Sequence, residues 1–433
     1  MNSPRKIIII GLISLFSFIV LHSQQLPPNV LKDVSRLTSK EFMGRGFSYN
    51  GNLKAANYLA ERYKEIGLNA FEDGYFQSFK FPMNLIIPVP ILEINGNKMD
   101  LGDDFIPYPL SGSGIVSTDD PIIYASNGLI LPNQNINDFK DLLINDAVVV
   151  INETLTDSIK NNKAISPDDI SKNSRIKNAQ DLGAKAVLIK ASNLVYGAPK
   201  SRFNIPIVDV KSETVDEKIN NINLNIVSRF DSVKSNNVIG YIRGSLYQDS
   251  TVVISAHYDH VSALSEDCYF PGANDNASGV AMILSLAEYF TNNPIKYKIV
   301  VAAFSGEEEG LWGSKYFSEN PYIDLSKCKF MLNLDMVASG NKSIMAVGGK
   351  DFTKQFEILS FINDSLNLGE LGQRLNAPNS DHYPFTQKGV EAFFLYANKG
   401  TQPYHNIYDV PETLNWNSFS DIYELSRRFI EKL

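Results

Sequence analysis

Cysteine is scarce in this chain, with only two among 433 residues. Two cysteines are too few for a disulfide framework or a cysteine-rich zinc module. A basic excess is also missing, because 40 Lys and Arg residues face 48 Asp and Glu residues and the net charge is −8. Without that excess the chain cannot neutralise many phosphate groups, so we expect no nucleic-acid partner.

Long hydrophobic runs are equally rare. Residues 7–21 form an almost unbroken apolar run, preceded by Arg5 and Lys6 and followed by polar residues. This run is shorter than the about 20 residues of a spanning helix, which favours a secretory signal peptide over residues 1–23. An uncleaved membrane anchor is the alternative. We therefore expect an exported protein, periplasmic or secreted, with no stable membrane span after cleavage.

Histidine is absent from residues 86–232, where short apolar runs at 147–151, 186–189 and 205–210 alternate with polar stretches. The whole chain is 44% hydrophobic and 20% charged, an ordinary globular composition, and its length predicts two or three structural units. This change in the pattern of apolar and polar residues predicts a small α/β domain, residues 86–232, inserted into a larger domain made of residues 28–85 and 233–433.

Continuous apolar runs dominate the C-terminal half, at residues 252–256, 299–304, 330–334 and 392–396. Such runs are typical of parallel strands buried on both faces, with helices between them. The expected fold is an α/β sandwich with a mixed, mostly parallel sheet. In such sheets the ligand site lies at the carboxyl ends of the strands.

Polar residues are concentrated directly after these runs. The side chains that follow the strands, or lie in the loops between them, include His257, Asp275, Asp335, His405 and the acidic triplet 307–309. Converging carboxylates repel each other unless cations balance them. Imidazoles and carboxylates together suit two divalent ions, with zinc as the default, and a carboxylate that bridges two metals is common in hydrolytic sites.

The spacing of these residues resembles the M28 family of dinuclear zinc peptidases. The motifs that carry the resemblance are His257-x-Asp259, Gly-Ala-Asn-Asp275-Asn-Ala-Ser-Gly, Glu307-Glu308-x-Gly-Leu, Asn333-Leu-Asp335-Met, Ser380-Asp381-His382 and Tyr404-His405. Residues 37–68, with Gly44-Arg45, are similar to the N-terminal segment of that family. Residues 182–189 and 205–208 resemble a protease-associated (PA) domain.

The resemblance implies a ligand set for two zinc ions. His257 and Asp335 would together bind one ion, Glu308 and His405 would together bind the other, and Asp275 would bridge the two ions. These five residues are the expected metal ligands.

The resemblance also implies roles for residues that do not bind metal. Glu307 would act as general base and then as general acid, Tyr404 would stabilise the oxyanion, and Asp259 would orient the His257 ring. Residues 381–382 would support the site. His260 would either line the pocket or be a hydrogen-bonded bystander.

The function expected from this resemblance is that of a zinc-dependent exopeptidase, with an aminopeptidase favoured. The alternatives are a carboxypeptidase of the same family, a single-zinc enzyme resembling glutaminyl cyclases, and an inactive binding ectodomain. The inserted domain would shape access to the site, bind substrate or act as a passive spacer. Cys268 and Cys328 are expected at opposite ends of the sheet, too far apart for a disulfide, and so as two free thiols.

Overall fold

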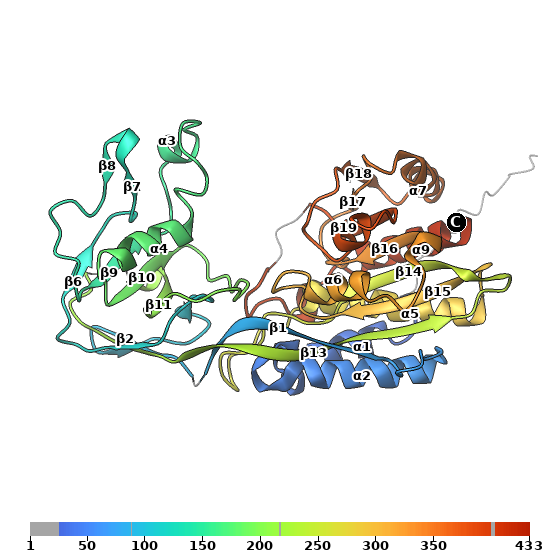
Figure 1. Cartoon of the computed structure of the whole chain (residues 1–433), viewed down its shortest axis with the longest axis horizontal. Coiled ribbons are helices and arrows are strands. Elements are labelled where there is room, and N and C mark those ends of the chain that lie inside the picture. Colours follow the sequence, from blue (N-terminus) through green and yellow to red (C-terminus); the bar gives the residue numbers. More distant parts are fainter. Residues whose placement is uncertain (1–25, 88, 216–217, 400–402) are drawn as a thin grey trace, which may run out of the picture.

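The computed structural model describes residues 26–87, 89–215, 218–399 and 403–433, which form two lobes (Figure 1). The predicted signal peptide, residues 1–23, lies outside the described residues. Within the described ranges no helix combines the length and the apolar character needed to cross a membrane. We call residues 26–86 and 228–433 the large unit and the residues between them the insert.

An eight-stranded sheet forms the centre of the large unit, in the order β1-β13-β15-β14-β16-β19-β17-β18. Its strands are β1 (Phe76–Ile86), β13 (Ser228–Ile242), β14 (Tyr247–His257), β15 (Tyr297–Phe304), β16 (Cys328–Leu334), β17 (Ser343–Val347), β18 (Glu370–Arg374) and β19 (Ala392–Ala397). The four neighbours β15, β14, β16 and β19 are parallel. They contain the four predicted apolar runs, so their carboxyl ends meet at one edge of the sheet.

Helices cover both faces of this sheet, which confirms the predicted α/β sandwich. One apolar core packs against α1 (Val30–Leu37), α2 (Gly51–Ile66), α5 (Gly279–Asn292), α7 (Thr353–Leu366) and α9 (Trp416–Lys432). A second core on the other face includes residues of α6 (Trp312–Glu319) and α8 (His382–Thr386). Helix α2 ends at Ile66, because the following Gly67 adopts a φ of 89° that favours glycine.

The insert has sheets and cores of its own. One sheet contains β4 (Phe105–Pro107), β11 (Ile207–Lys211), β10 (Ala186–Ala191), β9 (Val148–Asn152) and β6 (Ile122–Tyr124), in that order. The other contains β3 (Asn97–Lys98), β2 (Ile91–Ile94), β12 (Ile222–Ile226) and β5 (Gly114–Val116). The remaining elements are the β7 (Ile130–Leu131) and β8 (Ile136–Asn137) pair, α3 (Asp157–Lys160) and α4 (Lys172–Asp181). The assignment to the PA class stays a prediction.

A two-stranded ribbon joins the insert to the large unit (Figure 1). Strands β1 and β13 pair antiparallel over their shared length, from Phe76 opposite Val238 to Ile86 opposite Ser228. The main-chain groups of residues 228–232 therefore find their partners in β1, and the ribbon begins before the predicted boundary at residue 232.

The two cysteines are free thiols, as the sequence predicts. Cys328 begins β16 at the amino end of that strand, whereas Cys268 lies buried in the loop after β14.

Candidate metal centre

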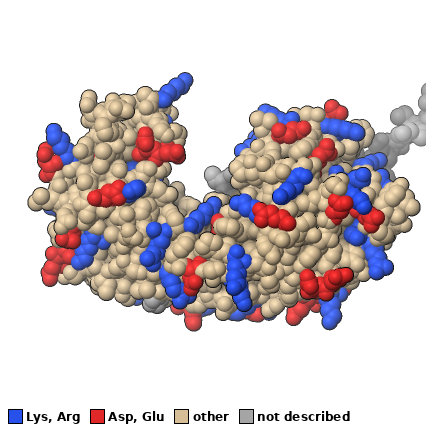
Figure 2. Space-filling model, in the orientation of Figure 1, with Lys and Arg blue, Asp and Glu red and all other residues tan. Residues whose placement is uncertain are grey.

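The predicted site residues gather at the carboxyl edge of the large sheet. His257 is the last residue of β14, Asp335 directly follows β16, and Glu307 comes three residues after β15. They border a cavity of about 270 Å³, which is lined by His257, Asp275, Glu307, Glu308, Asp335, Met336, Asn379, Phe394, Tyr396 and Tyr404. A hollow between the two lobes is visible in Figure 2, where charges of both signs are interspersed over the face shown.

One group of ligand-type side chains, which we call the first cluster, consists of His257, Asp275 and Asp335. The Nε2 atom of His257 lies 3.3 Å from Oδ1 of Asp275 and 3.2 Å from Oδ1 of Asp335. All three side chains are buried. One imidazole nitrogen and two carboxylates thus face a common point.

The second cluster consists of His260, Asp275, Glu308 and His405. The Nε2 atom of His405 lies 2.9 Å from Oδ2 of Asp275 and 3.0 Å from Oε2 of Glu308. The two carboxylate oxygens of Asp275 therefore face different clusters, which is the placement that a bridging ligand needs. Within this cluster Nδ1 of His260 lies 2.7 Å from Oε1 of Glu308, and neither His260 nor His405 is among the residues that line the cavity.

The donor set of the two clusters fits two divalent ions. Within each cluster one ligand atom per residue lies within 4.8 Å of the others, and all the donors are nitrogen or carboxylate oxygen atoms, as zinc accepts. Burial raises the pKa of Glu307 well above its ordinary range, and the nearby Glu308 raises it further. Burial would lower the pKa of His257, but Asp335 and Glu307 raise it well above its ordinary value. The crowded negative charge calls for cations.

The three consecutive glutamates have different surroundings. Glu307 and Glu308 line the cavity, whereas Glu309 is 3% exposed and does not line it. Burial and the charge of Asp259 raise the pKa of Glu309 well above its ordinary range. The predicted roles require that Glu307 and Glu308 line the cavity. If the roles belonged to Glu308 and Glu309 instead, Glu309 would have to line it.

Asp259 contacts the His257 ring differently from the prediction. The Nδ1 atom of His257 lies 3.2 Å from the main-chain oxygen of Asp259 but 4.0 Å from its carboxylate. The carboxylate instead accepts hydrogen bonds from the main-chain N–H groups of Glu307, at 3.3 Å, and Glu308, at 3.4 Å. Its side chain therefore positions the acidic turn, and its carbonyl positions the histidine.

A chain of buried hydrogen bonds holds Asp335 in place. Ser380 donates to Oδ2 of Asp335 at 2.8 Å, and Asn333 donates to the Ser380 hydroxyl at 2.7 Å. Ser255 donates to Oδ1 of Asn333 at 2.7 Å. The supporting role was expected for Asp381 and His382, but the hydrogen bond to Asp335 comes from the preceding Ser380. Asp381 and His382 are also buried.

Two residues fix the main chain around Asp275, and the sequence did not predict this role for either of them. The buried Arg45 guanidinium donates to five main-chain carbonyls, among them Gly272 at 2.8 Å and Asp275 at 3.2 Å. The Asp409 carboxylate accepts from the N–H groups of Asn274, at 2.9 Å, and Asp275, at 3.0 Å. Gly44-Arg45 was noted only as a resemblance, and no spacing pattern links Asp409 to a residue 134 positions earlier.

Tyr404 lines the cavity next to the second cluster. Its ring stacks on that of His405, with 3.8 Å between centroids and 16° between the planes, and the residue is 45% exposed. The phenol thus has access both to the cavity and to solvent.

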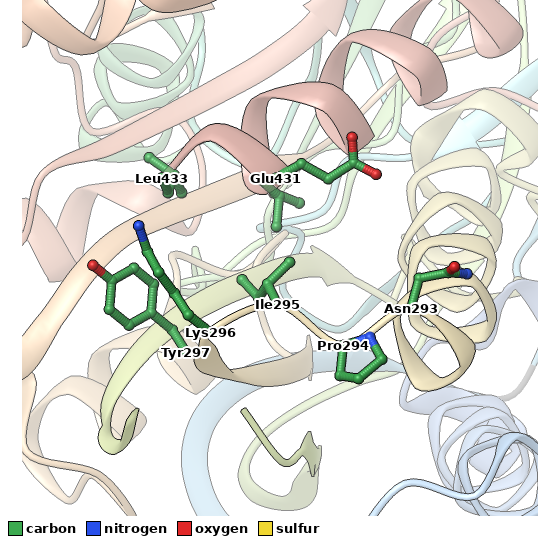
Figure 3. A pocket seen from close by; sticks show the side chains of 8 residues that line it. Asn293, Pro294, Ile295, Lys296, Tyr297, Glu431 and Leu433 are labelled. Atoms are coloured by element: carbon green, nitrogen blue, oxygen red, sulfur yellow. The ribbon is translucent and has the colours of Figure 1, made fainter. Parts of the chain in front are cut away.

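A second cavity, of about 430 Å³, lies at the opposite edge of the sheet (Figure 3). It is bordered by residues 293–297, where β15 begins, and by the end of α9. None of the described groups that could hold a metal borders it. The candidate site is therefore the smaller cavity.

Residues 237–430 match the family model described as Peptidase family M28. Among curated proteins, the chain is similar to Aminopeptidase YwaD of Bacillus subtilis, 30% identical over 268 residues that cover 57% of this chain and 56% of the relative. It is also similar to a probable zinc metalloprotease of Pyricularia oryzae, 34% identical over 113 residues that cover 26% and 22%. The matches thus span about half, or less, of the length of these relatives.

Solved structures resemble nearly the whole chain, insert included. The zinc aminopeptidase BSAP from Bacillus subtilis matches with a TM-score of 0.68 and 20% identity, over 93% of this chain and 94% of that one. A Peptidase M28 precursor from Shewanella amazonensis matches with a TM-score of 0.66 and 17% identity, over 93% and 92%. At these identities the likeness establishes the fold.

Proposed function

We propose that this chain is a zinc-dependent aminopeptidase of peptidase family M28, whose family model matches residues 237–430, and that it removes N-terminal residues from peptides. The chief support is the pair of clusters that share Asp275, whose two oxygens face His257 and His405 separately. The names of the relatives, which include aminopeptidases and zinc metalloproteases, agree with this assignment.

The proposed ligand roles use the five residues expected from the resemblance, all of which lie in the two clusters. His257 and Asp335 would hold one zinc ion, Glu308 and His405 would hold the other, and Asp275 would bridge them. Zinc bound there supplies Lewis acidity to the scissile carbonyl and to water. A single-zinc enzyme would not need the first cluster beside the second, so the geometry favours two ions.

Glu307 is the proposed general base. It lines the cavity, and it belongs to neither cluster. Its carboxylate takes a proton from the attacking water and later delivers that proton to the leaving amine. Tyr404 lines the cavity and stacks on the His405 ring, and its phenol would donate to the oxyanion that develops on the substrate.

The charge of the cavity favours a substrate amine over a substrate carboxylate. Four of the described lining residues are Asp or Glu, and none is Lys or Arg. Three of the four would be engaged by zinc, which leaves Glu307 to attract a free N-terminal ammonium group, and no described Lys or Arg lines the cavity to receive a C-terminal carboxylate. This is why we prefer an aminopeptidase to the carboxypeptidase alternative.

The cavity also favours an apolar N-terminal side chain. Met336, Phe394 and Tyr396 form an apolar part of its wall. Burying one CH₂ group contributes about 0.8 kcal/mol, so peptides that begin with Leu or Met should be cleaved faster than those that begin with Gly, Asp or Lys.

A peptide panel with free or blocked termini, read by mass spectrometry, tests the proposal. N-terminal acetylation should nearly abolish hydrolysis, and C-terminal amidation should change it little. The opposite pattern would identify a carboxypeptidase. No cleavage of any peptide by zinc-loaded protein would favour the binding ectodomain, and cyclisation of N-terminal glutamine would favour the cyclase-like enzyme.

We also propose that the protein is exported, because residues 1–23 have the sequence pattern of a signal peptide. Expression of the full chain in a bacterium should yield mature protein that starts near residue 24, outside the inner membrane. Full-length protein retained in the membrane fraction would instead identify an anchor.

A further inference from the structure

The insert contacts the second cluster through main-chain atoms. Nδ1 of His405 lies 2.9 Å from the carbonyl oxygen of Tyr196, which belongs to the insert. The N–H group of Tyr196 in turn donates to the carbonyl oxygen of His405 at 2.9 Å. Two residues 209 positions apart are thus joined by a reciprocal pair of hydrogen bonds.

This contact sets the chemistry of the His405 ring. A neutral imidazole has one N–H group and one lone pair, and donation from Nδ1 to a carbonyl leaves the lone pair on Nε2. Nε2 is the atom that faces Asp275 and Glu308. The carbonyl of Tyr196 therefore selects the tautomer and the ring orientation that a metal ligand needs.

Apolar packing from both units holds Tyr196 at this position. The Tyr196 ring is 6% exposed and stacks on Phe270 of the large unit, with 5.4 Å between centroids. The surrounding buried cluster comprises Ile106, Ala191 and Leu194 of the insert and Val261, Leu264 and Cys268 of the large unit. If the insert moved away, this packing and the contact with His405 would be lost together.

We propose that docking of the insert through Tyr196 sets the zinc affinity of the second cluster, so that the insert is a positioning element for one of two metal sites. This inference rests on the proposed function, since it assumes that both clusters bind zinc. The first cluster has no such dependence, because the carbonyl that faces Nδ1 of His257 belongs to Asp259 in the large unit.

Zinc titration of metal-free, full-length protein against a chromophoric chelator tests this proposal. Tyr196→Ala removes the ring that anchors the docked segment, and Tyr196→Pro removes the N–H group that donates to His405. In both variants one of two zinc equivalents should bind roughly 10–100-fold more weakly, as is typical when an outer partner of a ligand is lost. The other equivalent should keep its affinity.

Two further variants separate positioning from general damage. Tyr196→Phe keeps the ring and the main chain, so it should bind both ions as the wild type does. Phe139→Ala truncates a buried aromatic ring in the insert's own core, away from the contact, and should also leave both affinities unchanged.

Several outcomes would overturn the inference. They are wild-type affinity at both sites in folded Tyr196→Ala and Tyr196→Pro, equal weakening of both sites, or an equal loss in Phe139→Ala. Failure of the proposed function looks different, because then the wild-type protein itself would bind fewer than two zinc equivalents.

Discussion

The two clusters that share Asp275 differ in the origin of the contacts behind their ligands. In the first cluster, Asp259 supplies the carbonyl that faces His257, and Ser380 donates to Asp335. All of these residues belong to the large unit. In the second cluster, the carbonyl that faces His405 comes from Tyr196 of the insert. Ligands of similar chemistry can therefore depend on one structural unit or on two.

This difference predicts separate responses at the two sites. Outer contacts fix the orientation of metal ligands and tune their affinity. A change inside the large unit can weaken the first site alone, and a change at the insert can weaken the second site alone. A change at Asp275 is the exception, because it touches both.

Asp275→Asn should have the largest effect, since one substitution removes a carboxylate from both clusters. We expect loss of both zinc equivalents on dialysis, and a fall in kcat beyond the roughly 10²–10⁴-fold typical of losing one acid–base group. Elemental analysis and peptide hydrolysis measure the two effects. Asp267→Asn, at a side chain that is 93% exposed in the loop before Asp275, is the control and should change neither. Retention of both ions in Asp275→Asn would refute a shared ligand.

Glu307→Gln should come next, because it removes the proposed base and leaves both clusters intact. We expect kcat to fall roughly 10²–10⁴-fold while two zinc equivalents remain bound. Glu308→Gln is the contrasting variant, and it should lose zinc from the second cluster, since a neutral amide is a poorer ligand than a carboxylate. If Glu307→Gln lost metal and Glu308→Gln kept it, the two roles would have to be exchanged.

Ser380→Ala should weaken the first site alone, as the counterpart of the Tyr196 variants. Removing the hydroxyl that donates to Asp335 should lower one zinc affinity roughly 10–100-fold. Combined with Tyr196→Ala it should weaken both sites, which chelator competition would resolve. Ser285→Ala is the control, because Ser285 is also buried but donates to a carbonyl within its own helix. It should leave both zinc affinities unchanged. Equal weakening of both sites by Ser380→Ala alone would erase the distinction between the clusters.

Tyr408→Phe should have the smallest effect. Tyr408 is 51% exposed, and its hydroxyl donates to Asp103, so it joins the two units close to His405 but at the surface. Losing this hydrogen bond should cost about 1 kcal/mol of unfolding free energy or less. Zinc affinity should change less than about twofold, because exposed contacts contribute little. A larger loss of zinc would mean that the exposed contact, rather than the buried Tyr196, couples the insert to the site.

Much of the site was predictable because its residues follow buried strands. The apolar runs that became β14, β15 and β16 predicted where the strands end, and His257, Glu307 and Asp335 lie at or after those ends. Parallel strands bring their carboxyl ends to one edge of a sheet, so local pattern was enough to place these side chains together.

Other contacts had no local signal. Asp259 was predicted to orient the His257 ring, and the atom nearest to Nδ1 is its main-chain oxygen, because its carboxylate accepts from the N–H groups of the acidic turn. Asp409 and Tyr196 act on residues more than 130 positions away. Main-chain acceptors exist at every residue, so the amino-acid sequence does not mark the few that matter.

The sequence by itself determined the strands, the order of the ligand-type residues and the likeness to a peptidase family, because hydrophobic periodicity and motif spacing are local properties. Only the tertiary structure decided that Asp275 faces two histidines, that His260 lies beside Glu308, and that the insert reaches His405. Those relations depend on how separate segments pack in three dimensions, and packing joins atoms whose separation along the chain carries no pattern.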